Sequence, residues 1–386
     1  MKKIVAAAAA GLILAGAAFA DVSFSWKRTN IVGGTSKALD NVARADCVAL
    51  ELSNDIAGVV FDWDIEEQAK DTSKLSLDSY YGWMTFGLPV GNLQVTSGKW
   101  SGRYADRVKT DAGDLDSAYY EAYKMGVITA DDDSDIVKIA TKFAADSDNL
   151  TEGNMATVLA YTLADTLPGT LLVKAGIVNF PKVETEIGGK KVEIFPADYG
   201  KFDSQSGFVA EVGYRQEGLF NVNLALKTPK DKLTVFSAFV SPLMVENLRA
   251  TVGFTMGNYD GDSEFAFDAR ARYAVTEKTA VTGMFNYSSI SKDLIGTEDD
   301  LNRMWTMVSV NHVAGDNIRF LATLQNTVRD FDADNGNNLT AFTPACEITV
   351  SEKAVVTAAF DMRWDNKTPY AGVGDVSLPI YVTLSL

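Results

Sequence analysis

The sequence predicts an all-β fold, a transmembrane antiparallel up-and-down β-barrel of about 16–18 strands. Two observations favour this fold. Segments of roughly ten residues alternate apolar and polar side chains, and this is the length that a tilted strand needs to cross a bilayer. The connections between these segments alternate between short turns and long polar loops, as in a barrel with tight turns at one rim and longer loops at the other.

The apolar residues are dispersed along the chain. Hydrophobic residues make up 47% of the sequence, yet no run of about 18 apolar residues follows the N-terminal segment, which excludes a helical membrane protein. The chain holds 51 acidic and 35 basic residues, a formal net charge of -16. Such a charge disfavours nucleic acid as a partner and is consistent with solvent-facing loops.

The first twenty residues are typical of a cleaved secretory signal peptide. Lys2-Lys3 precedes an apolar stretch over residues 4–17, and Ala18-Phe19-Ala20 forms a small-x-small site before Asp21. The short apolar core and the well-formed site argue against the alternative of a membrane anchor helix. The expected division of the chain is a signal peptide at 1–20 and a barrel at 21–386.

The alternation is clearest over residues 264–273. One face there carries Phe265, Phe267, Ala269, Ala271 and Tyr273, and the other carries Glu264, Asp268, Arg270 and Arg272. Side chains two apart share a face of a strand, so one face suits lipid and the other suits water. The same pattern is found at 220–227, 247–256, 318–325, 356–363 and 377–386.

Traced back toward the N-terminus, the pattern predicts about eighteen strands in all. The earlier ones are expected near Phe24, Val48, Phe61, Trp83, Leu93, Thr157 and Leu171, although 57–65 and 80–88 alternate less cleanly. Short connections are expected at 216–218, 242–246, 274–278, 314–316 and 351–353, and long ones at 258–263, 289–302, 329–338 and 365–375. A soluble β-sandwich also alternates, but its strands average about five to six residues.

Signatures of catalysis are nearly absent, so we expect no enzyme activity and no cofactor. The only histidine, His312, shares its parity with Val308 and Val310 beside a short turn, which favours a packing or interfacial role. One histidine cannot supply a two-histidine zinc site, and no phosphate loop or dinucleotide fingerprint occurs. Cys47 and Cys346 lie far apart in sequence, and we interpret both as packing residues.

Three acidic runs raise the alternative of weak calcium binding in external loops. They lie at 131–135, 260–262 and 330–334. Oxygens recur at every second residue, as in a calcium loop, but the glycine and the distal Glu of a helix-loop-helix site are missing. Apolar residues at helical spacing follow Asp135, so the first run is better explained as complementing a helix N-terminus. We therefore predict no metal site.

Two short motifs resemble the general porins of the outer membrane. Residues 91–99, Gly-Asn-Leu-Gln-Val-Thr-Ser-Gly-Lys, are similar to the turn and strand before the third external loop of that family. Residues 377–386 resemble the C-terminal assembly strand, although the family usually ends in Phe and this chain ends in Leu386. The resemblance implies the outer membrane of a diderm bacterium, contact with its lipid, homotrimers, and passive diffusion of small hydrophilic solutes.

The resemblance also implies an inward-folded constriction loop at residues 101–154. Residues 91–99 belong to the fifth strand by our count, and a connection of about fifty residues follows, which is long for a loop without a function of its own. The connection holds twelve acids and six bases. Acidic pore-lining residues are expected at Asp114, Asp116, Asp131, Asp132, Asp133 and Asp135.

Basic side chains on the predicted lumen faces of later strands form an opposing wall. They are Lys174, Arg215, Lys227, Arg249, Arg270, Arg272, Arg319 and Arg363. Acids on the same faces, among them Glu211, Asp268 and Glu347, leave open the alternative that these residues keep the lumen hydrated and salt-bridged rather than selective.

Aromatic side chains favour the boundary between membrane and water. On the lipid-facing parity, Tyr214 and Tyr273 lie beside short turns, whereas Tyr287 and Trp364 lie beside long loops. This placement predicts two aromatic girdles.

The function that the sequence favours is an outer-membrane porin, a passive diffusion channel for small hydrophilic solutes and ions. The main alternative is a barrel-anchored surface adhesin or antigen that acts through its external loops. A transporter for hydrophobic substrates is expected to carry a plug before its first strand, whereas the strand pattern starts at residues 22–26. A secreted soluble β-protein is the remaining alternative.

Overall fold

The computed structural model describes residues 21–35, 39–68, 72–102, 150–151, 154–164, 168–181, 184–187, 190–193, 204–230, 233–259, 261–292, 299–328, 338–365 and 376–385. Every element of regular structure within these ranges is a β-strand. None of these residues belongs to a helix that is long and apolar enough to cross a membrane. The signal peptide predicted at 1–20 lies outside the described residues.

The strands follow the predicted positions from the first onward. The first seven are β1 (Asp21–Thr35), β2 (Leu39–Ser53), β3 (Ala57–Gln68), β4 (Thr72–Gly87), β5 (Asn92–Trp100), β6 (Asn154–Leu163) and β7 (Thr170–Pro181). A separate hairpin of β8 (Glu184–Ile187) and β9 (Lys190–Glu193) comes next. The others are β10 (Ser204–Gln216), β11 (Phe220–Lys230), β12 (Leu233–Pro242), β13 (Leu248–Tyr259), β14 (Asp262–Thr276), β15 (Thr279–Ile290), β16 (Leu301–Gly315), β17 (Ile318–Val328), β18 (Asn338–Ser351), β19 (Ala354–Ala359), β20 (Asp361–Asp365) and β21 (Val376–Ser385).

Consecutive strands pair antiparallel, and the pairing returns to its start. β7 pairs with β10 and so bypasses the β8–β9 hairpin, while β21 pairs with β1 from Lys27 opposite Ser385 to Thr35 opposite Ser377. Only Phe360 separates β19 from β20, and both pair with β18 and β21. The described sheet holds nineteen strands, or eighteen when β19 and β20 count as one. The prediction of an antiparallel up-and-down barrel of about 16–18 strands is confirmed.

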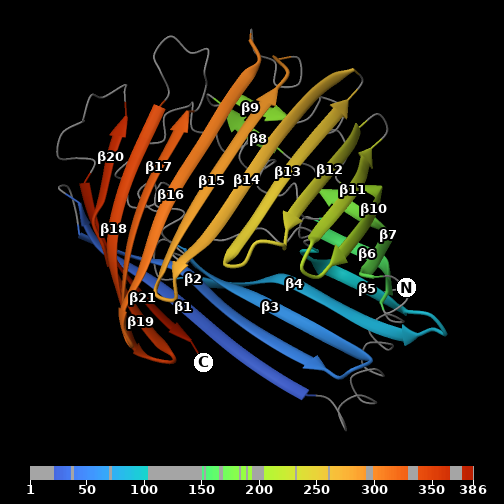
Figure 1. Cartoon of the computed structure of the whole chain (residues 1–386), viewed down its shortest axis with the longest axis horizontal. Coiled ribbons are helices and arrows are strands. Elements are labelled where there is room, and N and C mark those ends of the chain that lie inside the picture. Colours follow the sequence, from blue (N-terminus) through green and yellow to red (C-terminus); the bar gives the residue numbers. More distant parts are fainter. Residues whose placement is uncertain are drawn as a thin grey trace.

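The barrel presents two walls in Figure 1. The strands from β11 to β18 stand side by side as one tilted wall, and β1–β4 cross below them. Three of the hairpins have two-residue turns, at 277–278, 316–317 and 352–353. These positions agree with the predicted short turns.

One predicted long connection, 258–263, is wrong. Tyr259 pairs directly with Asp262, and Asn258 pairs with Ser263, so the polar residues that favoured a loop belong to the ladder. Gly261 adopts a φ of 109°, a backbone conformation that glycine supplies without a steric penalty in a tight turn.

Two features of the N-terminal half break the simple pattern. A β-bulge between β3 and β4 pairs Asp62 with Ser79 and Trp63 with Leu77, which leaves Asp78 as the extra residue. The extra residue reverses the parity that faces inward on the two sides of Asp78 along β4. The β8–β9 hairpin was not predicted, although its loop is a Gly-Gly pair at 188–189, a recognised hairpin signal.

Candidate functional site

The outward face of the strands is apolar and exposed. On β13 and β14 the outward residues Val252, Phe254, Met256, Phe265 and Phe267 keep 36–44% of their surface accessible. Other exposed apolar side chains on the same face of the sheet are Phe208, Val212, Leu224, Leu226, Phe236, Val240, Phe320 and Leu324. A soluble protein rarely exposes so extended an apolar surface, whereas bilayer hydrocarbon covers it favourably.

The inward face of the same strands is polar and enclosed. Thr251 and Thr255 alternate with the outward residues of β13 and are 0% and 2% exposed, and Asp268 on β14 is 3% exposed. This distribution is the reverse of that in a soluble protein. Combined with a ring of antiparallel strands that satisfies its own backbone hydrogen bonds, it defines a membrane-spanning β-barrel with a polar interior.

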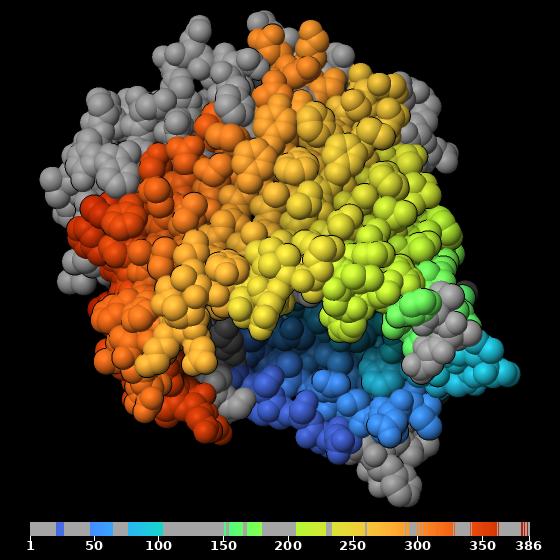
Figure 2. Space-filling model, viewed as in Figure 1, coloured from blue at the N-terminus to red at the C-terminus, as the bar shows by residue number. Residues whose placement is uncertain are grey.

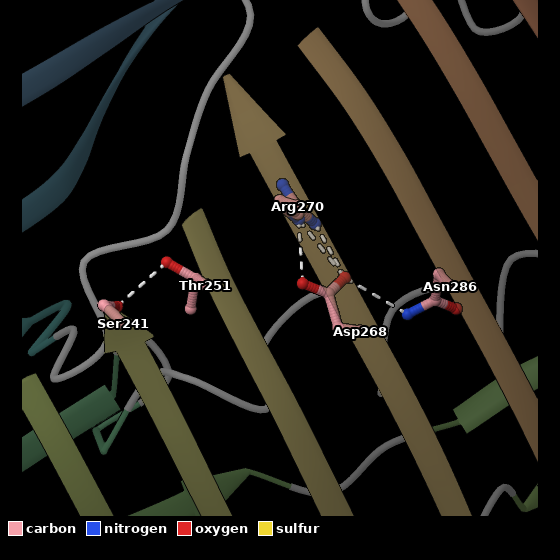
Figure 3. Close-up of polar contacts among 5 residues, drawn as sticks. All are labelled: Ser241, Thr251, Asp268, Arg270 and Asn286. Atoms are coloured by element: carbon pink, nitrogen blue, oxygen red, sulfur yellow. Dashed lines mark hydrogen bonds and ion pairs between the residues drawn. The ribbon is translucent and has the colours of Figure 1, made fainter. Parts of the chain in front are cut away.

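Hydroxyl groups on neighbouring strands pair across the inward face. Figure 3 shows one pair, in which Ser241 Oγ lies 3.1 Å from Thr251 Oγ1. The others are Ser237–Thr255 at 3.0 Å and Ser309–Thr323 at 3.1 Å. A hydroxyl both donates and accepts, so each pair satisfies enclosed polar groups without introducing a charge.

Four of the predicted basic residues form ion pairs with acids of the same wall. On β14, Arg270 Nε donates to Asp268 Oδ1 at 2.9 Å, and Asn286 Nδ2 on β15 donates to the other carboxylate oxygen at 3.4 Å, as seen in Figure 3. On β17, Arg319 Nη2 donates to Glu347 Oε2 of β18 at 2.6 Å. The charge of each guanidinium is therefore balanced within a few ångströms.

The most deeply enclosed of these pairs joins Lys174 on β7 to Glu211 on β10. Lys174 Nζ lies 2.7 Å from Glu211 Oε2, with side chains 16% and 0% exposed, and Asn223 Nδ2 on β11 donates to Glu211 Oε1 at 3.2 Å. The fourth pair is exposed and lies beside a short turn, where Arg215 Nη2 is 3.0 Å from Glu217 Oε1. These contacts support the salt-bridged interpretation of the basic wall.

The other four predicted basic residues differ in their surroundings. Lys227 is only 1% exposed. Arg249 on β13 and Arg272 on β14 lie directly opposite each other in the register. The side chain of Arg363 lies outside the described residues.

The two described ends of the long connection are tied together. β5 ends at Trp100 and β6 begins at Asn154, as predicted for the fifth strand. The amide of Leu150 donates to the carbonyl of Gly102 at 2.9 Å, and the amide of Gly102 donates to Thr151 Oγ1 at 2.8 Å. The Thr151 hydroxyl donates in turn to the carbonyl of Trp100.

The returning end packs against the inward wall. Leu150 is 0% exposed and belongs to one apolar cluster with Val158, Val178, Val209 and Phe239, which come from β6, β7, β10 and β12. Trp100 packs onto the same cluster. The predicted acids Asp114, Asp116, Asp131, Asp132, Asp133 and Asp135 lie outside the described residues.

Two acids on the opposite wall were missed by the sequence analysis. Glu51 on β2 pairs with Val60 on β3, and Val60 pairs with Tyr81 on β4. Asp62, two residues beyond Val60, shares its face. The signal was available in the alternation of Asp62 and Asp64 with Phe61 and Trp63, but the three consecutive apolar residues at 59–61 interrupt the pattern.

Three of the predicted girdle residues lie on the outward parity. Tyr273 is 48% exposed, Tyr214 contacts Phe220 with ring centroids 5.9 Å apart, and Tyr287 contacts Phe265 at 5.6 Å. The side chain of Trp364 lies outside the described residues.

His312 and the two cysteines were interpreted as packing or interfacial residues. His312 Nδ1 lies 2.9 Å from Thr279 Oγ1 on the exposed surface. Cys47 and Cys346 are not joined in a disulfide. Within the described residues no group of three or more His, Cys, Asp or Glu side chains could hold a metal ion. Of the three acidic runs, only 261–262 is described.

Comparison with known proteins agrees with the class that the geometry defines. No family model matches the chain, and no curated protein matches it. Among solved structures, OccK11 (OpdR) of Pseudomonas aeruginosa aligns with a TM-score of 0.53 at 6% identity, over 95% of this chain and 96% of that chain. OccK3 (OpdO) of the same organism aligns at 0.53 and 12% identity, over 97% and 99%.

Acinetobacter baumannii OccAB4 aligns at 0.53 and 9% identity, over 95% of this chain and 97% of that chain. These matches are outer-membrane porins. At such identities the likeness is one of fold: this chain has the β-barrel fold of outer-membrane porins.

Proposed function

We propose that this protein is an outer-membrane porin, a passive diffusion channel for small hydrophilic solutes and ions. The observation that carries the proposal is the reversed distribution of side chains, with Phe254 and Phe267 exposed outward and Thr251 and Asp268 enclosed inward. About eighteen strands enclose a lumen wide enough for water. Water and small solutes need the polar lining that the inward hydroxyls and ion pairs supply.

We further propose that residues 101–154 narrow this lumen. The support is the returning end, because Leu150 and Thr151 are both 0% exposed and Leu150 packs onto inward-facing side chains. The connection carries twelve acids and six bases, so its net charge is opposite to that of the wall that contains Lys227 and Arg249.

The proposed location is the outer membrane of a diderm bacterium, reached after removal of residues 1–20. The exposed apolar face contacts outer-membrane lipid, and we propose a homotrimer as the assembly. Membrane fractionation combined with native mass spectrometry in detergent tests both statements. A protein found in the soluble fraction contradicts the first, and a monomer at all concentrations contradicts the second.

Single-channel recording in a planar lipid bilayer tests the function directly. The purified folded protein is expected to produce discrete current steps in KCl, and a heat-unfolded aliquot of the same preparation serves as the control. Vesicles that contain the protein should swell in solutions of small sugars and should not swell when the sugar molecule is wider than the pore. A folded barrel that produces neither steps nor swelling contradicts a channel and favours the adhesin alternative.

A further inference from the structure

The two sides of the barrel differ in how far their inward side chains are enclosed. On the strands from β10 to β17, the inward residues Val209, Glu211, Thr251, Met307 and Thr323 are each 0–1% exposed. On β1–β4 no described side chain is buried. Figure 2 shows the surface hollowed between the yellow-to-orange turns of the β13–β17 wall and the blue strands below them. Open space therefore borders the inward face of β1–β4.

The register identifies which side chains of β2–β4 face this space. Tyr81 packs against Trp100 with ring centroids 5.9 Å apart, and Trp100 packs onto the interior apolar cluster, so Tyr81 faces inward. Val60 and Glu51 occupy the same row of the register as Tyr81. Glu51 therefore faces inward, and Asp62 shares the inward face of β3 with Val60.

Every charged side chain described on this inward face is acidic. The residues are Asp21, Glu51, Asp62 and Asp64. Among the described residues neither Glu51 nor Asp62 takes part in an ion pair, and Oδ1 of Asp62 is enclosed without a hydrogen-bond partner. The carboxylates of this wall thus differ from the basic groups of the opposite wall.

Three bases of the opposite wall are balanced locally. Lys174, Arg270 and Arg319 each lie within 2.9 Å of a carboxylate oxygen on the same or the next strand. The field of a close ion pair falls off much faster with distance than the field of a single charge. An ion in the lumen therefore meets the carboxylates of Glu51 and Asp62 as stronger fixed charges than these three ion pairs.

We propose that solutes cross along the inward face of β1–β4, and that Glu51 and Asp62 make this path prefer cations. The proposal rests on the channel function and adds the position of the path and the sign of the charge that it favours. Fixed charges beside a narrow aqueous path concentrate the counter-ion. The aromatic ring of Tyr81, which lies in the same row of the register as Glu51, also favours cations over anions.

Reversal potentials in a KCl gradient test the selectivity. The wild type is expected to prefer K⁺, and the double variant Glu51→Gln/Asp62→Asn should lower the permeability ratio of K⁺ to Cl⁻ by roughly two- to tenfold. The matched control is Asp55→Asn. Asp55 is an exposed acid on the turn between β2 and β3, outside the inward face of these strands, so its neutralisation should leave the ratio unchanged.

The outcomes separate the two proposals. A wild-type protein that gives no current steps contradicts the channel function itself. A wild type that conducts, with a permeability ratio that the double variant does not change or that Asp55→Asn changes equally, overturns this inference and leaves the channel function intact.

A second experiment locates the path without altering the two acids. In a Cys47→Ser/Cys346→Ser background, Ser25→Cys places a thiol on the inward row of Asp62, and Ser237→Cys places one on the opposite wall, where Ser237 is 1% exposed. A trimethylammonium-ethyl methanethiosulfonate reagent should change the current through Ser25→Cys and leave Ser237→Cys unaffected. The reverse result places the path along the other wall and overturns the proposal.

Discussion

The ring of Phe239 on β12 lies directly over the backbone of Gly253 on β13, its partner in the register. A Cβ atom added to Gly253 would overlap the Cδ1 and Cε1 atoms of that ring. Phe239 is 2% exposed and joins the apolar cluster around Leu150. The missing side chain of Gly253 therefore makes the space in which an inward-facing aromatic ring can lie against the wall.

Replacing Gly253 by Ala should displace this ring and destabilise the barrel by about 1–3 kcal/mol, because the side chain would overpack an enclosed site. The midpoint of urea unfolding in lipid vesicles measures the change. Gly283→Ala is the matched control, since a Cβ there meets nothing within 4 Å. Equal effects of the two substitutions would show that the contact with Phe239 is not the cause.

The variant Leu150→Ser should release the returning end of the long connection from the wall. Truncating a fully enclosed leucine costs about 2–5 kcal/mol, and this cost falls on the contacts that hold residues 150–151 in place. We expect noisier single-channel currents with a higher mean conductance. Leu219→Ser, at a turn where the leucine is 41% exposed, should leave the currents unchanged. If the currents of Leu150→Ser were as quiet as those of the wild type, Leu150 would not anchor the returning end of the connection.

Lys174→Met should be strongly destabilising, because it leaves the carboxylate of Glu211 enclosed without its cation. The expected loss in the free energy of unfolding is about 3–5 kcal/mol, whereas Lys174→Met/Glu211→Leu should recover much of it, since replacing both partners of a buried pair is often nearly neutral. Urea titrations of Lys174→Met, Glu211→Leu and the double variant complete a double-mutant cycle. Strictly additive losses would mean that the two groups do not interact.

Arginine on the outward face should cost more at mid-strand than at the rim. Leu324 lies in the middle of β17 and Ile318 at its first residue beside a short turn, and they are 49% and 42% exposed on the same face. Leu324→Arg is expected to cost about 2–4 kcal/mol and Ile318→Arg about 0–1 kcal/mol. The measurement is the free energy of unfolding from vesicles. The opposite order would mean that the outward face does not meet lipid.

Much of the fold could be predicted from local pattern. The period of two placed Phe265 and Phe267 outward and Asp268 inward, because a strand with lipid on one side and an aqueous lumen on the other admits no other arrangement. The fifth strand and the connection after it were also predictable, since Trp100 and Asn154 bound a stretch without alternation. The connection at 258–263 was not, because a polar residue in a ladder and a polar residue in a loop look alike in sequence.

The arrangement of the lumen was harder to predict, because it depends on pairings between distant strands. Lys174 meets Glu211 only because β7 pairs with β10 across the β8–β9 hairpin. Counting bases and acids on the predicted faces identified both residues but could not show that they neutralise each other. Glu51 and Asp62 were missed because they stand out only by comparison with the opposite wall, whose inward side chains are buried. Burial of that kind cannot be predicted from a local sequence pattern.

The direct bond between residues 102 and 150 has a consequence for how such a chain can evolve. Because the two ends of the connection meet at the wall, the register of β5 and β6 is set by residues on either side of that junction and not by the length of chain between them. Closure of a longer loop adds only about 0.6 kcal/mol for each doubling of its length. Insertions and deletions between the two ends can therefore accumulate without shifting a strand, so the segment proposed to narrow the pore is free to diversify while the barrel stays the same.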